Sequence, residues 1–340
     1  MKSSAYISHA LSFMAAAVTV VSAASLTGDG YIYITKPTTV WTPPSNVYNT
    51  TRFLWYPDKS ALRFGDESSA FGMFNPANIG TYSFSGGMNS KASGDHSFSF
   101  GYYAFAESMH SIALGSYSSA GGEASSAFGS DSYATGDNAT ALGYMASASG
   151  QRSFSLGGNA AATSSVAIGT GSSAIAPYSV AIGMGAGATG AGSVAVSADY
   201  YAAATGDYSM AFGGLSISAG NYSYAMGENA QALADYSSAI GYFAYTSAQS
   251  SVAIGGGTKS IRRNGSATSP GTPQTDDPVF MVGLGRLGPA GTVPAHNALT
   301  IFRNTDAHFG GVVRVMPGGD IPMGNESISY TAKPAGVAFP

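Results

Sequence analysis

Small and bulky apolar residues alternate in a short phrase that recurs along residues 68–257. The phrase is Ser-φ-Ala-φ-Gly, where φ is usually large and apolar, and residues 165–169 read Ser-Val-Ala-Ile-Gly. Its closing position falls at 72, 87, 101, 115, 129, 143, 157, 169, 183, 197, 213, 227, 241 and 255, so the period is 14 residues almost throughout. A fixed short period is typical of a solenoid, in which each repeat forms one unit stacked on the next.

Each repeat has the length of one coil of a β-solenoid, with two strands of about five residues and two tight turns. The Ser-φ-Ala-φ-Gly phrase predicts the first strand. An Ala-x-Ala or Ala-x-Gly phrase half a repeat later, as at 104–106 and 134–136, predicts the second. An aspartate or asparagine often follows the second turn and is interpreted as a turn residue rather than a ligand. These residues are Asp95, Asp137, Asp207, Asn221 and Asp235.

Alternation within the first strand predicts which side chains face the interior, because neighbouring side chains of a strand point to opposite faces. A coil this short encloses a narrow space that only small side chains can fill. We therefore expect the central alanine of each phrase inside and its large neighbours outside. The opposite arrangement, with the large residues inside and alanine outside, is the alternative that the pattern leaves open.

The residues before the closing position are almost all large, with Gly86 as the exception. Stacked coils would align them into one stripe, larger than the few hundred Å² of contiguous apolar surface that a soluble monomer usually exposes. Burying each large side chain stabilises by about 1.5–3 kcal/mol, so another copy of the chain is expected to cover the stripe. The predicted interface consists of Leu114, Phe128, Leu142, Leu156, Ile168, Ile182, Val196, Phe212, Met226, Ile240 and Ile254.

The recurring Ser-Val-Ala-Ile-Gly phrase with its alanine-rich half-repeat resembles the head repeats (Hep/Hag repeats) of YadA-like trimeric autotransporter adhesins. The resemblance covers residues 68–257, over half of the chain. It implies an all-β fold, a left-handed parallel β-roll or β-solenoid, three chains packed through their apolar faces, and a role as a surface adhesin. The coiled-coil stalk, the neck and the membrane anchor of that family are not recognisable in this sequence.

The flanks differ from the repeats. Residues 1–24 have a lysine, an apolar run and then small residues, which predicts a secretory signal peptide. Residues 25–67 contain both tryptophans and predict an N-terminal β cap, with an aromatic platform for carbohydrate as the alternative. Residues 258–278 are polar and predict a linker, and the apolar runs within 279–340 predict a small C-terminal β segment.

Composition excludes several classes of chemistry. Charged residues make up only 9% of the chain and the net charge is −4, which argues against a nucleic-acid partner. The acidic residues are scattered singly, without the paired carboxylates of glycosidases. No metal-ligand spacing is present among His9, His96, His110, His296 and His308. We therefore predict no enzymatic activity, no cofactor and no metal site.

These observations together predict a secreted or cell-surface, adhesin-like homotrimer with no transmembrane segment in the mature chain. Its partner would be an extracellular protein or glycan, bound along the polar outer face. Tyrosines would supply amphipathic contacts there, such as Tyr102, Tyr117, Tyr133, Tyr208 and Tyr222. The alternatives are a purely structural fibre or surface-layer component and, third, a β-solenoid enzyme that acts on polysaccharides.

Overall fold

The computed structural model describes residues 24–26, 32–34, 51–68, 72–197, 201–260, 262, 267–268, 273–283, 297–304, 307–309, 313–315 and 319–321. The chain divides into an N-terminal unit, residues 1–131, and a C-terminal unit, residues 132–340. The signal peptide predicted for residues 1–24 lies outside the described residues except for its last residue. Trp41, His9 and His296 also lie outside them.

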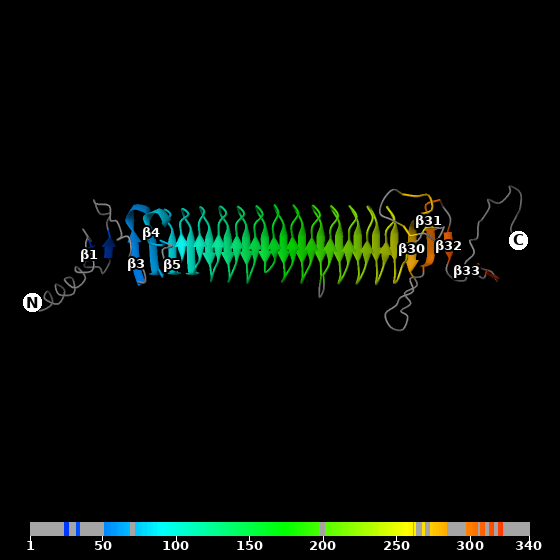
Figure 1. The fold of residues 1–340 in the computed structure, drawn as a ribbon, viewed down its shortest axis with the longest axis horizontal. Helices are drawn as coiled ribbons and strands as arrows, with labels where there is room; N and C mark the ends of the chain where they lie inside the picture. Colours follow the sequence, from blue (N-terminus) through cyan, green and yellow to red (C-terminus); the bar gives the residue numbers. More distant parts are fainter. Residues whose placement is uncertain are drawn as a thin grey trace, which may run out of the picture. The chain divides into compact units, whose positions relative to one another are not determined.

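The N-terminal unit is a parallel β-solenoid in which a long and a short strand alternate along the chain (Figure 1). The long strands pair in parallel in the order β4 (Ala61–Asp66), β5 (Phe84–Met88), β7 (Phe98–Tyr102), β9 (Ile112–Leu114) and β11 (Ser126–Phe128). The short strands are β6 (Lys91–Ala92), β8 (Phe105–Ala106) and β10 (Ser119–Ala120). Strand β3 (Thr51–Tyr56) pairs antiparallel with β4, and β1 (Ala24–Leu26) pairs antiparallel with β2 (Ile32–Ile34).

The C-terminal unit repeats this arrangement. Its long strands are β13 (Thr140–Leu142), β15 (Phe154–Leu156), β17 (Val166–Ile168), β19 (Val180–Ile182), β21 (Val194–Val196), β23 (Met210–Phe212), β25 (Tyr224–Met226), β27 (Ser238–Ile240) and β29 (Val252–Ile254). Its short strands are β12 (Tyr133–Ala134), β14 (Ser147–Ala148), β16 (Asn159–Ala160), β18 (Ser173–Ala174), β20 (Gly187–Ala188), β22 (Ala203–Ala204), β24 (Ile217–Ser218), β26 (Gln231–Ala232) and β28 (Tyr245–Thr246). The strands of most coils span three and two residues, so the prediction of about five residues per strand was too long.

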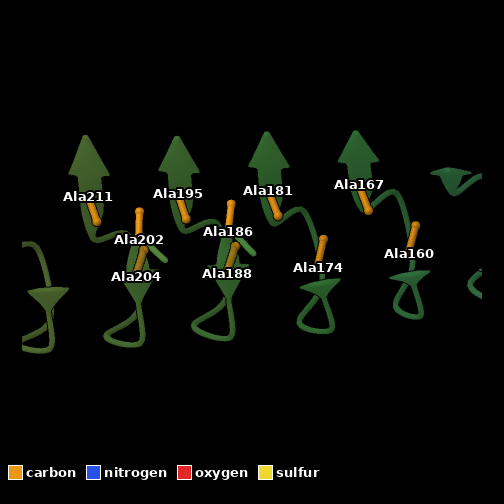
Figure 2. Packing of buried hydrophobic residues seen from close by; sticks show 10 residues of the cluster. All are labelled: Ala160, Ala167, Ala174, Ala181, Ala186, Ala188, Ala195, Ala202, Ala204 and Ala211. Carbon is orange, nitrogen blue, oxygen red and sulfur yellow. The ribbon is translucent and has the colours of Figure 1, made fainter. Parts of the chain in front are cut away.

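Alanine fills the interior of the coils. Ala181 on a long strand and Ala174 on a short strand are both fully buried, and Figure 2 shows the alanines of the two strand sets pointing toward one another. The bulky neighbour Ile182 is 37% exposed. The arrangement with alanine inside is therefore confirmed, and the alternative with the large residues inside is wrong.

In most coils the serine that opens the phrase closes the turn before the long strand, although the buried hydroxyls of Ser153, Ser193 and Ser209 have no hydrogen-bond partner among the described residues. In the turn before β19, the Ser179 hydroxyl donates to the Ala176 carbonyl at 2.6 Å, and the Ser179 backbone N–H donates to the same oxygen at 3.2 Å. The Ser179 carbonyl accepts from the Val166 N–H of the preceding coil at 2.9 Å. A buried hydroxyl needs such a partner, and serine supplies one in the smallest volume.

At closing positions such as Gly115, close backbone approach between coils requires glycine, whereas Ser197 occupies one closing position and a Cβ at Gly157 would meet no atom of the described residues within 4 Å. Gly115 has a φ of +131°, and a Cβ at this position would lie 2.2 Å from the Gly129 carbonyl oxygen of the next coil. A side chain at Gly115 would therefore force these two coils apart. Where such a glycine closes the phrase, it allows successive coils to stack closely.

One coil is two residues shorter than its neighbours, and the missing residues belong to the turn after β15. Leu156 pairs with Ile168, 12 residues later, whereas Leu142 pairs with Leu156, 14 residues later. Ser155 replaces the interior alanine here. Its hydroxyl donates to the Gly158 carbonyl at 2.6 Å and lies 3.2 Å from the Gly158 N–H, so it fastens the tighter turn.

Each unit has a large side chain in the interior column where the regular coils end. At the N-terminal side, Arg63 of β4 pairs in register with Ser85, and its guanidinium donates to the Ser83 hydroxyl and the Ala92 carbonyl, each at 2.6 Å. Burial lowers the pKa of Arg63 to about 10. In the C-terminal unit, Met281 pairs in register with Ala253 and is fully buried.

The segment after the last regular coil begins by extending the long-strand sheet. Strand β30 (Pro278–Gly283) pairs in parallel with β29, and β31 (Asn297–Phe302) and β32 (Ala307–Phe309) follow in antiparallel order. Strand β33 (Val313–Val315) pairs antiparallel with β34 (Gly319–Ile321) in a separate two-stranded sheet. The strands predicted within 279–340 are thus present, but the first of them continues the long-strand sheet.

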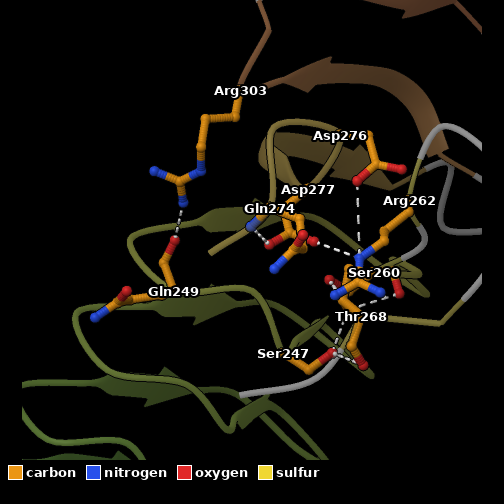
Figure 3. A network of polar contacts seen from close by, with 9 residues as sticks. All are labelled: Ser247, Gln249, Ser260, Arg262, Thr268, Gln274, Asp276, Asp277 and Arg303. Carbon is orange, nitrogen blue, oxygen red and sulfur yellow. Dashed lines mark hydrogen bonds and ion pairs between the residues drawn. The ribbon is translucent and has the colours of Figure 1, made fainter. Parts of the chain in front are cut away.

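Polar side chains tie the loop predicted as a linker to this end of the solenoid (Figure 3). Arg262 Nε lies 2.8 Å from an Asp277 carboxylate oxygen, and Asp277 is 1% exposed. Thr268 Oγ1 donates to the Ser260 carbonyl at 3.0 Å, and its hydroxyl contacts that of Ser247. The described part of this loop is therefore packed against the last coils.

The packed interior predicts that Ala181 cannot be enlarged. In Ala181→Leu the added carbons have no space, and we expect a loss of about 1–3 kcal/mol of stability and a lower urea midpoint by circular dichroism. The control is Ile182→Leu on the outward side of the same strand, which should leave the midpoint nearly unchanged. Equal midpoints for the two variants would contradict a close-packed interior.

Candidate interaction surfaces

The predicted interface residues lie side by side on the outward face of the long strands. In the C-terminal unit, strand register aligns Leu142, Leu156, Ile168, Ile182, Val196, Phe212, Met226, Ile240 and Ile254. In the N-terminal unit, register aligns Phe100, Leu114 and Phe128. We call these two sets the apolar stripe. All of them are at least partly exposed, up to 52% at Met226.

A second outward column lies beside the apolar stripe. It is formed by the first flanking residue of each phrase, which the interface predicted from the sequence did not include. In the C-terminal unit its members are Thr140, Phe154, Val166, Val180, Val194, Met210, Tyr224, Ser238 and Val252. The outward face of the long strands is therefore two side chains wide, and it becomes more polar near Ser238.

Gly86, the exception in the stripe, makes room for aromatic rings. A Cβ at Gly86 would lie 2.6 Å from the Phe64 ring and 2.9 Å from the Phe100 ring. The centroids of those two rings are 6.0 Å apart, across the glycine. The missing side chain is thus replaced by its neighbours in the adjacent coils, and the face stays apolar.

Aromatic residues extend this face toward β3. Phe53 pairs directly with Phe64, and Trp55 pairs with Leu62, so their side chains share the face of the stripe. Phe53 is 73% exposed and Trp55 is 37% exposed. The tryptophan considered as part of a carbohydrate platform therefore lies on the apolar face rather than on a polar one.

The predicted contact tyrosines occupy several different positions on the coils. Tyr133 lies on a short strand and is 44% exposed. Tyr102 and Tyr117 lie at the corner after the long strands, where their rings meet edge to face at 5.2 Å. Their hydrogen bond raises the pKa of Tyr102. Tyr208 and Tyr222 lie at the corner after the short strands and stack in parallel at 5.1 Å.

A row of acidic and amide side chains links successive coils at this second corner. The Asp207 carboxylate accepts from the Ala191 N–H at 2.8 Å, Asn221 Oδ1 accepts from the Asp207 N–H at 2.9 Å, and Asp235 accepts from the Asn221 N–H at 2.8 Å. In the N-terminal unit Asp95 accepts from the Thr81 N–H at 2.7 Å. These residues are used within the fold, as predicted for turn residues.

The histidines that the structure places do not form a ligand set. His96 stacks on Tyr82 at 5.1 Å, and His110 lies 5.1 Å from His96 at the same corner. Among the described residues, no group of three histidine, aspartate or glutamate side chains could hold a metal ion. Within the same part of the chain, no helix is long and apolar enough to cross a membrane.

Short parallel coils with a small-residue interior and an outward apolar stripe define a repeat-built β-solenoid. The family model for the YadA head domain repeat (2 copies) matches residues 87–104, 106–132, 134–160, 160–186, 204–223, 218–244 and 234–258. Residues 87–258 of this chain therefore belong to the YadA head domain repeat family, which confirms the resemblance seen in the sequence. The YadA head is an adhesin-type domain and is typically non-enzymatic. A comparison with curated proteins found no match.

Because the Thr81 N–H donates to Asp95, the pKa of Asp95 lies below its ordinary value of 3.8. A depressed folded pKa means that the carboxylate stabilises its coil above the ordinary value, and that this contribution is lost as pH falls through the folded value. Hydrogen exchange at the Thr81 amide should therefore lose protection at acid pH in the unchanged protein. Asp95→Asn should remove this pH dependence, and Asp95→Ala should lower protection at every pH.

The exchange rates must be corrected for the intrinsic pH dependence of amide exchange before comparison. A Thr81 amide that responds to acid in the same way in Asp95→Asn and in the unchanged protein would contradict the assignment. The Ala variant controls for loss of the acceptor without any titrating group.

Proposed function

We propose that this chain forms the head of a homotrimeric, cell-surface adhesin, with left-handed coils and with the apolar stripe as the contact between the three copies. The observation that carries the proposal is the exposure of bulky apolar side chains on consecutive long strands, at 39% for Leu156 and 40% for Ile240. Proteins of the YadA head family form trimers and are exposed at the surface of Gram-negative bacteria. Export through the signal peptide predicted at residues 1–24 belongs to the same proposal.

Burial of the stripe would supply the free energy of association. Each large side chain removed from water contributes about 1.5–3 kcal/mol, and register places such side chains on neighbouring strands without a break in the C-terminal unit. In a closed three-fold arrangement each copy contacts its two neighbours head to tail, so a stripe that faces the symmetry axis can take part in all three contacts. The cap predicted at 25–67 and the segment predicted at 279–340 would flank this interface.

In such a trimer, the short strands and the corners of the coils would remain exposed and would bind the ligand. The short strands present Tyr133, Asn159 and Gln231 outward, and the corners present tyrosine edges and hydroxyl groups. Tyrosine combines apolar area with a hydrogen-bonding group, which suits contact with protein or glycan. Binding spread along a repeated surface, rather than one deep site, is the mode that this geometry supports.

The interface is tested by placing charge in the stripe. In the Ile182→Asp, Ile240→Asp double variant, each substitution removes apolar burial and would bury a carboxylate, so light scattering should report monomers where the unchanged chain forms trimers. The matched control is Thr189→Asp with Thr205→Asp, at exposed positions directly after the short strands β20 and β22 and away from the stripe, which should stay trimeric. Circular dichroism of each variant should match that of the unchanged chain, as a control that the substitutions do not unfold it.

A double variant that keeps the trimer mass would show that the stripe is not the interface. An unchanged chain that stays monomeric through a dilution series would contradict the trimer itself.

Adhesion is tested by measuring binding of the mature trimer to immobilised extracellular matrix proteins and to a glycan array. We expect saturable binding to at least one of these surfaces. The monomeric Ile182→Asp, Ile240→Asp variant should bind the multivalent surface more weakly, on the order of 10²-fold, because avidity is lost. A folded trimer that binds no protein and no glycan would contradict the adhesin proposal and favour a structural spacer.

A further inference from the structure

Tyrosine side chains form a stacked row at the corner after the short strands of the C-terminal unit. The ring centroids of Tyr208 and Tyr222 are 5.1 Å apart with 13° between the ring planes. Those of Tyr222 and Tyr236 are 5.3 Å apart with 1° between the planes. All three side chains remain exposed, at 53%, 44% and 57%, so their ring edges and hydroxyl groups face solvent.

The backbone holds these rings in register. Each of the three tyrosines has a φ between 55° and 58°, and the N–H of Tyr222 donates to the Asp207 carbonyl while that of Tyr236 donates to the Asn221 carbonyl. The preceding residues are the acidic and amide row described above, which links the same coils a second time. The spacing of the rings is therefore set by the solenoid and not by flexible side chains alone.

A second stacked pair lies in the N-terminal unit. Tyr103 and Tyr117 stack at 5.3 Å with 7° between the ring planes, at the corner after the long strands. Their φ angles are 53° and 54°. Parallel tyrosines one coil apart thus occur at two different corners of the solenoid, in two units of the chain.

One exposed tyrosine at the same corner, Tyr178, has no tyrosine stacked on it. Tyr178 precedes Tyr208 at this corner, but Gly192 occupies the coil between them, as shown by the bonds from Gly192 N to Pro177 O and from Tyr208 N to Ala191 O. Tyr178 is 65% exposed, more than any member of the stacked row. It therefore has greater access to solvent but no tyrosine in the neighbouring coil.

We propose that the stacked tyrosines are sites of oxidative cross-linking to dityrosine by a peroxide-dependent one-electron oxidant, such as a haem peroxidase. Each of two phenols gives one electron and one proton to the oxidant. The two phenoxyl radicals join through the ring carbons beside their oxygens, and the hydrogens on those carbons move to the oxygens to restore both phenols. Two tyrosines and one hydrogen peroxide thereby give one dityrosine and two waters.

Proximity makes this reaction efficient within one chain. Two groups held side by side react as in a unimolecular step, with a large gain over free partners in solution. The chain contains no cysteine, so disulfides cannot link its coils. A carbon–carbon bond between Tyr222 and Tyr236 would instead fasten two successive coils covalently. This inference does not depend on the oligomeric state or on the adhesin proposal.

The experiment treats the mature chain with a haem peroxidase and hydrogen peroxide and measures dityrosine fluorescence. Denaturing electrophoresis should show that most product keeps the mass of one chain. Cleavage before aspartate separates residues 207–234 from 235–275, so a Tyr222–Tyr236 bond should join these two fragments with the loss of two hydrogens. A bond between Tyr208 and Tyr222 should stay within the first fragment.

Two matched variants test which tyrosines form the cross-link. Tyr222→Phe keeps a ring in the stack but removes the phenol shared by both pairs, so the dityrosine of the C-terminal unit should be lost while that of Tyr103 and Tyr117 remains. Tyr178→Phe should leave the yield unchanged. The proposal is overturned if Tyr222→Phe retains the joined fragments, if Tyr178 cross-links as readily as Tyr222, or if the product consists mainly of bonds between chains.

Discussion

Backbone hydrogen bonds between successive coils are the constraint on which the other features depend. They hold each residue beside its equivalent in the next coil, at a strand spacing of about 4.8 Å. Val180, for example, donates to the carbonyl of Ser193 in the following coil. Because equivalent positions are stacked, residues of one type that recur at the same position of the repeat form a column along the solenoid. Small side chains form the core, large ones the apolar stripe, and acidic or amide ones a hydrogen-bonded row.

Different columns stabilise the fold by different means. The interior gives little apolar area per residue because it consists mainly of alanine and serine, so its contribution comes from dense packing and from the serine hydroxyls that bond to turn carbonyls, such as that of Ser179. The turns depend on glycine and on the links through Asp207 and Asn221. The apolar area that would normally form a core lies outside on the long strands, which is why stability and assembly are coupled in the proposed trimer.

The inward and outward positions of the coils could be predicted from the sequence because each position recurs in many repeats with the same type of residue. The inward alanine at 181 and the outward isoleucine at 182 followed from alternation together with the narrow interior of so short a coil. The roles of Arg63 and Met281 did not, because each occurs once, where the repeat stops and the period carries no information. The 14-residue spacing of Tyr208, Tyr222 and Tyr236 was visible, but stacking depends on ring orientation, which only coordinates give. The repeat pattern also carries no information about which extracellular protein or glycan the chain would bind.

The coil shortened after Leu156 has a consequence for how such a chain can change. Leu156 still pairs in register with Ile168 on the next long strand although two residues are missing between them. Val196 likewise pairs with Phe212 although that coil is two residues longer. Length variation is thus absorbed in the turn after the long strand, while the strands and their columns stay in place. This corner is the natural point for inserting an epitope or a reporter peptide, since new residues there alter what the surface displays and not how the coils stack.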